Sequence, residues 1–341
     1  MTQEIAPTPD AWRRLYALIA QVKEMAPWEW MFETDVFAVQ DPENQEYCFV
    51  SVMGNLGEHL SIAVYLGARA VYQLMGFVAR VNDGASGEEL LEIAHLQASF
   101  EDREQLSAQD RDTIKQLGLK FRGKMAWPLL RSYRAGFAPW HLEADEARIL
   151  TLALEQLLDA APRFGADEID FPAERGSFFT RVLGKDGRWL DQIATIPPAE
   201  PESIDIFIPR ETADAVRRLR RSHNIFEADL FLMPGVVGDR NSRPQMAYIF
   251  MVVDKNSGAI LSGEPLYVET TFAAMLAEIP KRIVRVCLKM QGVPGEIHVG
   301  SERVEWLLSS LSSLMDCKIK RMRRMPALDN ARSAMVQFFM R

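Results

Sequence analysis

Residues 243–267 of the chain are RPQMAYIFMVVDKNSGAILSGEPLY, and they decide the expected fold of its second half. Met246–Val253 is an almost unbroken apolar run rich in Ile, Val, Phe and Tyr, which is typical of a strand covered on both faces. The Asn-Ser-Gly sequence at 256–258 supplies the side-chain capping and permissive dihedrals that a chain reversal needs. Ala259–Leu261 begins a return strand, so the stretch predicts a hairpin at the centre of a sheet.

The chain has 341 residues, of which 48% are hydrophobic, and it can therefore bury two ordinary cores. A proline-rich stretch at 197–201 marks the sharpest break, because proline interrupts both helices and strands. We therefore expect an N-terminal domain at 1–161, a connector at 162–200 and a C-terminal domain at 201–341. Within the connector, two strand-like runs flank Gly184–Gly187 and predict a β-hairpin.

The first domain is expected to have an α+β fold that includes an antiparallel meander. Three strand-like runs, 36–40, 47–53 and 60–66, are separated by turns rich in Asp, Pro, Asn and Gly. Glu143–Leu158 has acidic residues in its first turn and apolar residues at helical spacing, which predicts an amphipathic helix. These patterns together predict the mixed α and β content of this domain.

The second domain shows a regular order of expected elements. A short strand at 204–208 and a helix reaching about Arg221 come first. From Phe226 onward the order is strand, strand, strand, helix, strand, helix, strand, helix. After the hairpin, the expected elements are a kinked helix over 270–290, a strand at 296–299, a helix over 301–315, a strand at 318–322 and a helix over 328–339.

The net charge of −8 is divided unevenly along the chain. Residues 1–200 carry 19 Lys and Arg against 31 Asp and Glu, a balance of −12. Residues 201–341 carry 20 against 16, a balance of +4. Such a division fits a polyanionic partner for the second half, or two halves of complementary charge.

Several motifs that would fix a location or a function are absent from the sequence. No leader for secretion precedes the first helix, and the longest apolar stretch, 60–81, contains two arginines, so we expect a cytoplasmic protein without membrane association. The three cysteines and five histidines are scattered, without the spacing of a disulfide framework or a zinc site. GxSxG, SxxK and glycine-rich cofactor motifs are missing as well, so we expect no bound cofactor.

Two stretches of the chain resemble an uncharacterised bacterial family with two domains. They are VSVMGNLGEHLSIAVYLGARAV at 50–71 and RPQMAYIFMVVDKNSGAIL at 243–261, one in each half of the chain. The resemblance covers both domains and implies no activity, because none is known for that family.

The order of elements from Phe226 resembles the ribonuclease-H-like fold, a three-layer α/β domain with a mixed sheet that ribonuclease H, retroviral integrases and many transposases share. The resemblance covers about 115 residues at the C-terminus and depends on element order, without a specific motif. Active members hold two divalent cations with carboxylates on the first strand, near the end of the fourth strand and on the final helix. Clustered carboxylates suit this chemistry, because a metal pair about 3.5 to 4 Å apart stabilises both the attacking and the leaving oxygen.

This sequence departs from the pattern of the active members. The fourth strand ends in His-Val-Gly-Ser at 298–301, so the aspartate expected there is absent. Asp229, Glu302 and Asp329 lie near the expected positions and are our candidates for catalytic carboxylates, with Mg²⁺ or Mn²⁺ as the cofactor. The alternative is that they are surface carboxylates and caps at helix starts.

Two basic clusters provide a second candidate site, for a polyanion. One ends a helix and the other lies in the last strand: Arg217, Arg218, Arg220 and Arg221, then Lys318, Lys320, Arg321, Arg323 and Arg324. Cations at a helix end are favoured by its dipole, and cations on a strand protect a sheet edge. Phosphate contacts would instead make affinity depend on salt. Edge protection does not require four cations within residues 320–324, which keeps phosphate binding open.

The sequence leaves three functions open. The first is a non-enzymatic binding or interaction protein whose C-terminal domain keeps a ribonuclease-H-like scaffold without its metal centre. The second is a divalent-metal-dependent nuclease or phosphotransferase that uses relocated carboxylates. The third is an accessory protein that binds nucleic acid through the basic clusters. We favour the first, with a protein or a nucleic acid as the partner.

Overall fold

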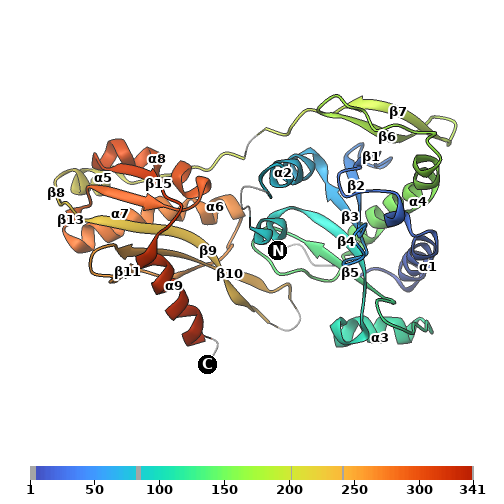
Figure 1. Cartoon of the computed structure of the whole chain (residues 1–341), viewed down its shortest axis with the longest axis horizontal. Coiled ribbons are helices and arrows are strands. Elements are labelled where there is room, and N and C mark those ends of the chain that lie inside the picture. The colour runs from blue at the N-terminus through green and yellow to red at the C-terminus, as the bar shows by residue number, and fades with distance from the viewer. Residues whose placement is uncertain (1–4, 82–85, 201, 240–241, 340–341) are drawn as a thin grey trace. The chain divides into compact units, whose positions relative to one another are not determined.

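The computed structural model describes residues 5–81, 86–200, 202–239 and 242–339. The chain divides into two compact units, each with its own mixed sheet and helices (Figure 1). Unit 1 comprises Met1–Ala135 and Pro139–Glu200, and unit 2 comprises Gly136–Ala138 and Pro201–Arg341. The mixture of helices with mixed sheets agrees with the expected α+β class. Within the described ranges, no helix has both the length and the apolar composition needed to cross a membrane.

Unit 1 is built on a seven-stranded sheet with the order β5-β4-β3-β2-β1-β6-β7. Neighbouring strands are antiparallel except β1 and β6, which are parallel. The predicted meander is therefore present as β1 to β3, and it continues through β4 and β5. The strands are β1 Phe37–Gln40, β2 Tyr47–Met53, β3 Ser61–Leu66, β4 His95–Glu101, β5 Trp127–Tyr133, β6 Ser177–Leu183 and β7 Trp189–Thr195.

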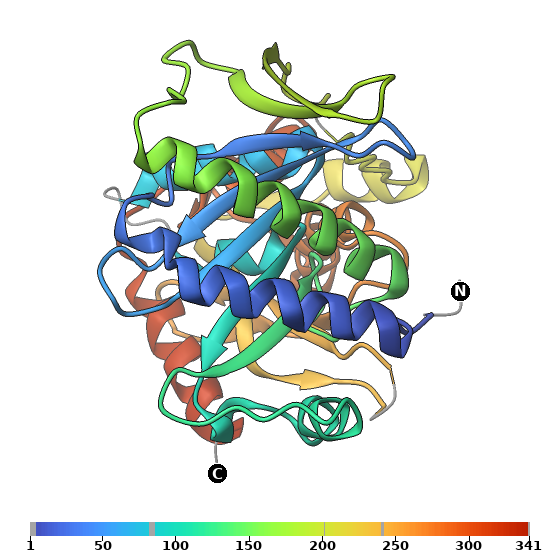
Figure 2. The same cartoon turned by 90° about the vertical axis from the view of Figure 1, so that its right-hand side faces the viewer.

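Helices cover both faces of this sheet. Helices α1 and α4 lie side by side across one face, where α1 buries Leu15, Ile19 and Val22 (Figure 2). Helix α2 packs on the other face through Ala70, Val71 and Leu74, which face Phe49 and Tyr65 of the strands. The helices of unit 1 are α1 Pro9–Met25, α2 Gly67–Arg80, α3 Ala108–Gln116 and α4 Ala144–Gly165, with 3-10 turns η1 Pro27–Glu29, η3 Gly87–Glu92 and η4 Arg103–Gln105.

The sequence predicts a separate connector at 162–200. In the structure, these residues belong to unit 1 instead. The predicted hairpin is present as β6 and β7, and β6 pairs with β1 in parallel. Phe178 and Phe179 on β6 point to opposite faces and are buried in the two cores of unit 1. The sequence shows the hairpin but not the strand edge to which it binds, because that edge is distant in the chain.

Unit 2 is built on a six-stranded sheet in which β9 is central. Its order is β11-β10-β9-β14-β15, and β12 also pairs with β10. Strand β10 runs antiparallel to β9, whereas β14 and β15 continue the sheet in parallel. The strands of this sheet are β9 Ile225–Val237, β10 Gln245–Asp254, β11 Ile260–Ser262, β12 Pro265–Leu266, β14 Glu296–Val299 and β15 Lys318–Arg321, and a separate pair comprises β8 Arg220–Arg221 and β13 Gly292–Val293.

The predicted turn after β10 forms around Asp254. Its Oδ1 accepts hydrogen bonds from the backbone N–H and the hydroxyl of Ser257, both at 2.8 Å. Gly258 takes a positive φ of 71°, which a residue with a side chain rarely adopts. The sequence predicts a hairpin at the centre of the sheet. In the structure, the return strand β11 lies at the edge of the sheet, so only the first strand of the hairpin, β10, has an interior position.

Helix α9 packs on β9 and β10, where Leu328 and Ala331 meet Phe231, Ile249 and Met251. Helices α5, α7 and α8 contact one another, and α8 also contacts β14 and β15. The helices of unit 2 are α5 Arg210–Arg217, α6 Phe272–Leu276, α7 Glu278–Met290, α8 Glu302–Met315 and α9 Pro326–Phe339.

Two predictions for the start of unit 2 are wrong. Residues 204–208 are apolar except for Asp205 but form no strand, because no described strand pairs with them. The following helix ends at Arg217 and not near Arg221, since Arg220 and Arg221 pair in parallel with β13. In both places a partner strand, or its absence, decides the local structure.

Candidate functional site at the ends of strands β9 and β14

Strand β9 carries two acidic side chains on one face. Alternate residues of a strand share a face, so Glu227 and Asp229 point to the same side as Phe231, which packs under α9. Glu227 is fully buried. The parallel register places His298 of β14, itself buried, directly beside Glu227. A strand in a hydrophobic core thus carries two carboxyl groups on one face.

Asp229 holds the N-terminal end of α8. Its Oδ1 accepts hydrogen bonds from the hydroxyl of Ser301 at 2.7 Å and from the backbone N–H of Leu230 at 2.9 Å. The Ser301 hydroxyl also accepts the backbone N–H of Val304 at 3.3 Å, which makes Ser301 the N-cap of α8. The carboxyl group is thereby bonded to the residue that fixes where α8 begins.

Gly300 lies against the side chains of Asp229 and Met325, and a side chain at this position would require them to shift. A Cβ atom there would lie 2.4 Å from Oδ2 of Asp229 and 2.9 Å from Cε of Met325. An aspartate at 300, the position at which the resemblance expects one, would therefore collide with Asp229. In the arrangement that the structure shows, an aspartate at 300 would require Asp229 to change its position.

Glu227 makes the corresponding contact with α9. Its Oε2 accepts the backbone N–H of Leu328 at 3.0 Å, one of the N–H groups in the first turn that have no partner inside the helix. A carboxylate is favoured there by the partial positive charge of the helix start. The other oxygen, Oε1, is buried and has no hydrogen-bond partner among the described residues. Two carboxyl groups of one strand are thus each bonded to the start of a different helix.

The pKa values of the acidic groups move in opposite directions. Burial raises the pKa of Asp229, although hydrogen bonds from Ser301, Leu230 and Gly300 and the charge of Arg332 oppose this change. Hydrogen bonds from Lys320 at 2.6 Å and from His298 at 3.0 Å lower the pKa of Glu296 on β14 to about 2. Glu296 is therefore ionised at neutral pH, and Asp229 is the acid that the fold shifts toward its protonated form.

The three predicted carboxylates do not gather. Of these, only Asp229 lies in the site just described. Glu302 is the first residue of α8, and its side chain is 74% exposed, with its carboxylate 3.5 Å from Arg321. Asp329 is exposed in the first turn of α9. In the part of the chain that the structure describes, no three Asp, Glu, His or Cys side chains come close enough to hold a metal ion.

Sequence reasoning missed Glu227, although the chain carries a signal for it. The run IFEADLFLM at 225–233 is apolar except for two acids at positions i and i+2. In a strand that is buried on both faces, such a pair must find hydrogen-bond donors or lose stability. An acidic pair inside an apolar strand therefore points to a built polar site.

The basic residues lie around the end of α5 and in β8, and in and just after the edge strand β15, and part of the set is neutralised by ion pairs. Arg217 contacts Asp214 at 2.9 Å, Arg221 pairs with Asp316, and Lys320 contacts Glu296 at 2.6 Å. Arg321 lies 3.5 Å from Glu302. The remaining members, for which the structure shows no ion pair with any residue it describes, are Arg218, Arg220, Lys318, Arg323 and Arg324.

Family comparisons agree with the division into two parts. Residues 12–181 match the model of a domain of unknown function (DUF7309), and residues 212–336 match that of a second domain of unknown function (DUF6930). The chain joins two uncharacterised domains. The first match extends into β6, as expected if β6 belongs to unit 1. No curated protein matches the chain, so the comparisons fit an uncharacterised two-domain family and provide no activity.

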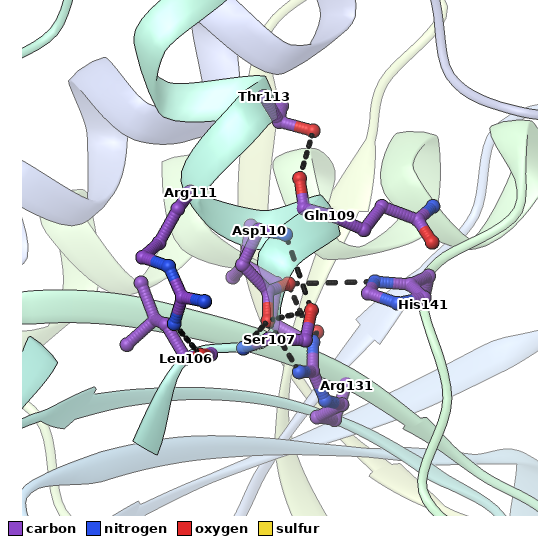
Figure 3. A network of polar contacts seen from close by, with 9 residues as sticks. Leu106, Ser107, Gln109, Asp110, Arg111, Thr113, Arg131 and His141 are labelled. Carbon is purple, nitrogen blue, oxygen red and sulfur yellow. Dashed lines mark hydrogen bonds and ion pairs between the residues drawn. The ribbon is translucent and has the colours of Figure 1, made fainter. Parts of the chain in front are cut away.

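Unit 1 contains a second polar cluster, around Asp110 at the start of α3 (Figure 3). Arg131 of β5 donates to both carboxylate oxygens, at 2.9 and 2.6 Å, and the hydroxyl of Ser107 donates at 2.7 Å. Nδ1 of His141 lies 3.4 Å from Oδ1. Burial alone would raise the pKa of Asp110, but the hydrogen bonds from Arg131, His141 and Ser107 outweigh it and lower this pKa.

This cluster contains Ser, His and Asp but lacks the geometry of a catalytic triad. A triad needs a histidine that takes the proton of the serine hydroxyl. Here the hydroxyl of Ser107 is bonded to Asp110, and Ser107 and Asp110 form the capping box of α3. The cluster fastens α3 to strand β5, so we assign it a structural role.

Proposed function

We propose that this protein is a non-catalytic binding protein whose unit 2 is a ribonuclease-H-like scaffold without a working metal centre. The strand order β11-β10-β9-β14-β15, with only β10 and its partners antiparallel, supports the scaffold. Helices follow β14 and β15 in the expected sequence. We further propose a cytoplasmic location, which the three buried free cysteines favour because reducing compartments keep thiols free.

One observation carries this proposal. The acidic side chains that β9 offers, Glu227 and Asp229, are bonded to the starts of α9 and α8, and position 300, where the next carboxylate is expected, is a glycine packed against Asp229. A two-metal centre needs several carboxylates with free oxygens directed at one point. Glu227 and Asp229 instead each bond one oxygen to the start of a helix, and of their other oxygens only Oε1 of Glu227 is without a partner among the described residues. This arrangement suits a scaffold in which the acids position helices.

A titration with Mg²⁺ or Mn²⁺ tests the loss of the metal centre. A ligand at 100 times its dissociation constant raises the free energy of unfolding by about 2.7 kcal/mol, so a true site would increase the melting temperature. We expect the same melting temperature with and without millimolar metal, in the wild type and in Asp229→Asn. A metal-dependent increase that Asp229→Asn abolishes would support the metal-dependent nuclease or phosphotransferase instead.

Binding of a nucleic acid is the second candidate function, and the cations without an ion pair favour it. Arg323 and Arg324 are exposed just after the edge strand β15, and Lys318 is exposed within it. Each phosphate contact releases counterions, so affinity would fall steeply with salt. The cations that are already paired would contribute less, because binding must first break an ion pair.

A salt series with duplex DNA separates this function from simple protection of the sheet edge. If β15 binds phosphates, the double variant Arg323→Glu with Arg324→Glu weakens binding and reduces its salt slope by about 2. Arg217→Glu with Arg221→Glu is the matched control, because these two cations are already paired with Asp214 and Asp316. Binding that is absent in the wild type, or equal in the two variants, leaves edge protection as the role of these cations.

A further inference from the structure

Strand β7 is an edge strand of unit 1 without the usual protection against association (Figure 1). Native sheets guard their edges with charges, prolines, short strands or covering segments. Strand β15 carries three exposed cations, and β11 has three residues. Strand β5 contains Pro128, and its Ser132 exchanges backbone hydrogen bonds with Trp140 at 2.8 and 3.0 Å. Among these described edges, β7 is the unguarded one.

The side chains of β7 are exposed and largely uncharged. Leu190 is 51% exposed and Ile193 is 57% exposed, whereas the neighbouring strand β6 is mostly buried. The one charged residue of β7, Asp191, forms ion pairs with Arg163 and Arg181 of the same unit. The edge strand therefore exposes apolar side chains, and its single charge is neutralised by ion pairs within unit 1.

The backbone of β7 also has free hydrogen-bonding groups. Gly184 donates to the carbonyl of Arg188, and Ile196 donates to the carbonyl of Gly176, so these two pairs are hydrogen-bonded pairs of the β6–β7 ladder. Bonded and non-bonded pairs alternate along an antiparallel ladder. The residues whose N–H and C=O groups point away from β6 are therefore Trp189, Asp191, Ile193 and Thr195.

We propose that β7 pairs antiparallel with β7 of a second copy of this chain, which joins two unit 1 sheets across a two-fold axis. In such a pair, the two-fold axis passes through one residue of β7, and residues equally far before and after it lie opposite each other. Because the residues whose N–H and C=O groups point outward are every second residue, each of them then lies opposite another such residue of the second copy. The edge is thus complementary to itself, as a two-fold interface requires. Because Asp191 is compensated within each copy, the two strands meet without unpaired like charges. This inference is independent of the function proposed for unit 2.

Salt should strengthen this dimer, in contrast to binding of a nucleic acid. Each copy carries a net charge of −8, so two copies repel one another at long range. Added salt screens that repulsion, while the apolar contacts and backbone hydrogen bonds of the interface persist. We expect sedimentation velocity to show a monomer–dimer equilibrium that shifts toward dimer as the protein or salt concentration rises.

Ile193→Pro tests the pairing directly. Proline removes the outward N–H of residue 193 but none of the ladder bonds to β6, and edge strands tolerate proline when this N–H faces solvent. We expect the variant to be monomeric, with the circular dichroism spectrum of the wild type and, at a protein concentration that keeps the wild type monomeric, the same melting temperature. Ile193→Thr is the matched control, because it keeps the N–H and the branched shape and raises the dissociation constant only about tenfold.

Ile193→Lys is the second variant, in case proline disturbs the hairpin. It leaves the backbone intact and places a cation at the edge of each copy, so we expect a folded monomer. A wild type that is monomeric at every concentration overturns the proposal, as does a folded proline or lysine variant that still dimerises. A dimer that dissociates when salt is added also overturns it. If the wild type stays monomeric but captures an extended peptide, the edge has a different occupant.

Discussion

The tightest packing in the candidate site occurs at Gly300. A methyl group there would lie 2.4 Å from the carboxylate of Asp229, so Gly300→Ala forces Asp229 or the start of α8 to move. We expect a loss of about 1–3 kcal/mol in the free energy of unfolding, measured with urea. Gly292→Ala is the control, because its nearest atom would be 3.5 Å away, an ordinary contact.

The double variant Gly300→Ala with Asp229→Ala tests whether this crowding is the cause. Removing the carboxylate frees the space that the new methyl group needs, so the loss caused by Gly300→Ala should be smaller in the Asp229→Ala background. Additive losses would show that Gly300 matters for another reason, such as its contact with Met325. The comparison isolates a single pair of residues.

At the scale of elements, the contact between α3 and β5 depends on the ion pair of Asp110 with Arg131. Both side chains are largely buried, so Asp110→Asn leaves a buried cation without its partner and should cost about 3 kcal/mol. Asp112→Asn, an exposed position on the same helix, is the control and should have little effect.

The pH dependence of this loss has a definite sign. The pKa of Asp110 is lower in the folded state than in the unfolded state, where the pKa of an aspartate is about 3.9. Its contribution to stability is therefore complete above that value and is lost as the pH falls through the folded pKa. The difference in unfolding free energy between wild type and Asp110→Asn should shrink in acid. A constant difference from neutral pH to acid would contradict this account.

At the scale of the whole molecule, the chain has two units with separate cores. Domains with their own cores unfold as their own cooperative units, and calorimetry then shows more than one transition. We expect Asp110→Asn to lower the melting temperature of one transition and Gly300→Ala to lower that of the other. A single transition that both variants shift equally would show that the units unfold together.

The features that the sequence predicted best are local. The meander of unit 1, the hairpin of β6 and β7 and the turn at Asp254 depend on residues close together in the chain, and the structure contains all three. The helix expected over 301–315 is of the same kind, and α8 spans Glu302–Met315. The strand expected at 204–208 does not form, because no described strand pairs with this mostly apolar run. Local pattern identifies a segment that can form a strand, but a neighbour must complete it.

The sequence by itself determined most of the elements and turns of this protein, together with its uneven charge, because these depend on composition and on neighbours a few residues apart. Only the tertiary structure decided what its acidic residues do. Glu227 bonds to a residue 101 positions away and Asp229 to one 72 positions away, so neither contact leaves a mark in the local pattern. The same holds for the pairing of β1 with β6. Contacts between distant segments follow from how the sheets and helices pack, and that packing settles which carboxylates are free and which fix a helix.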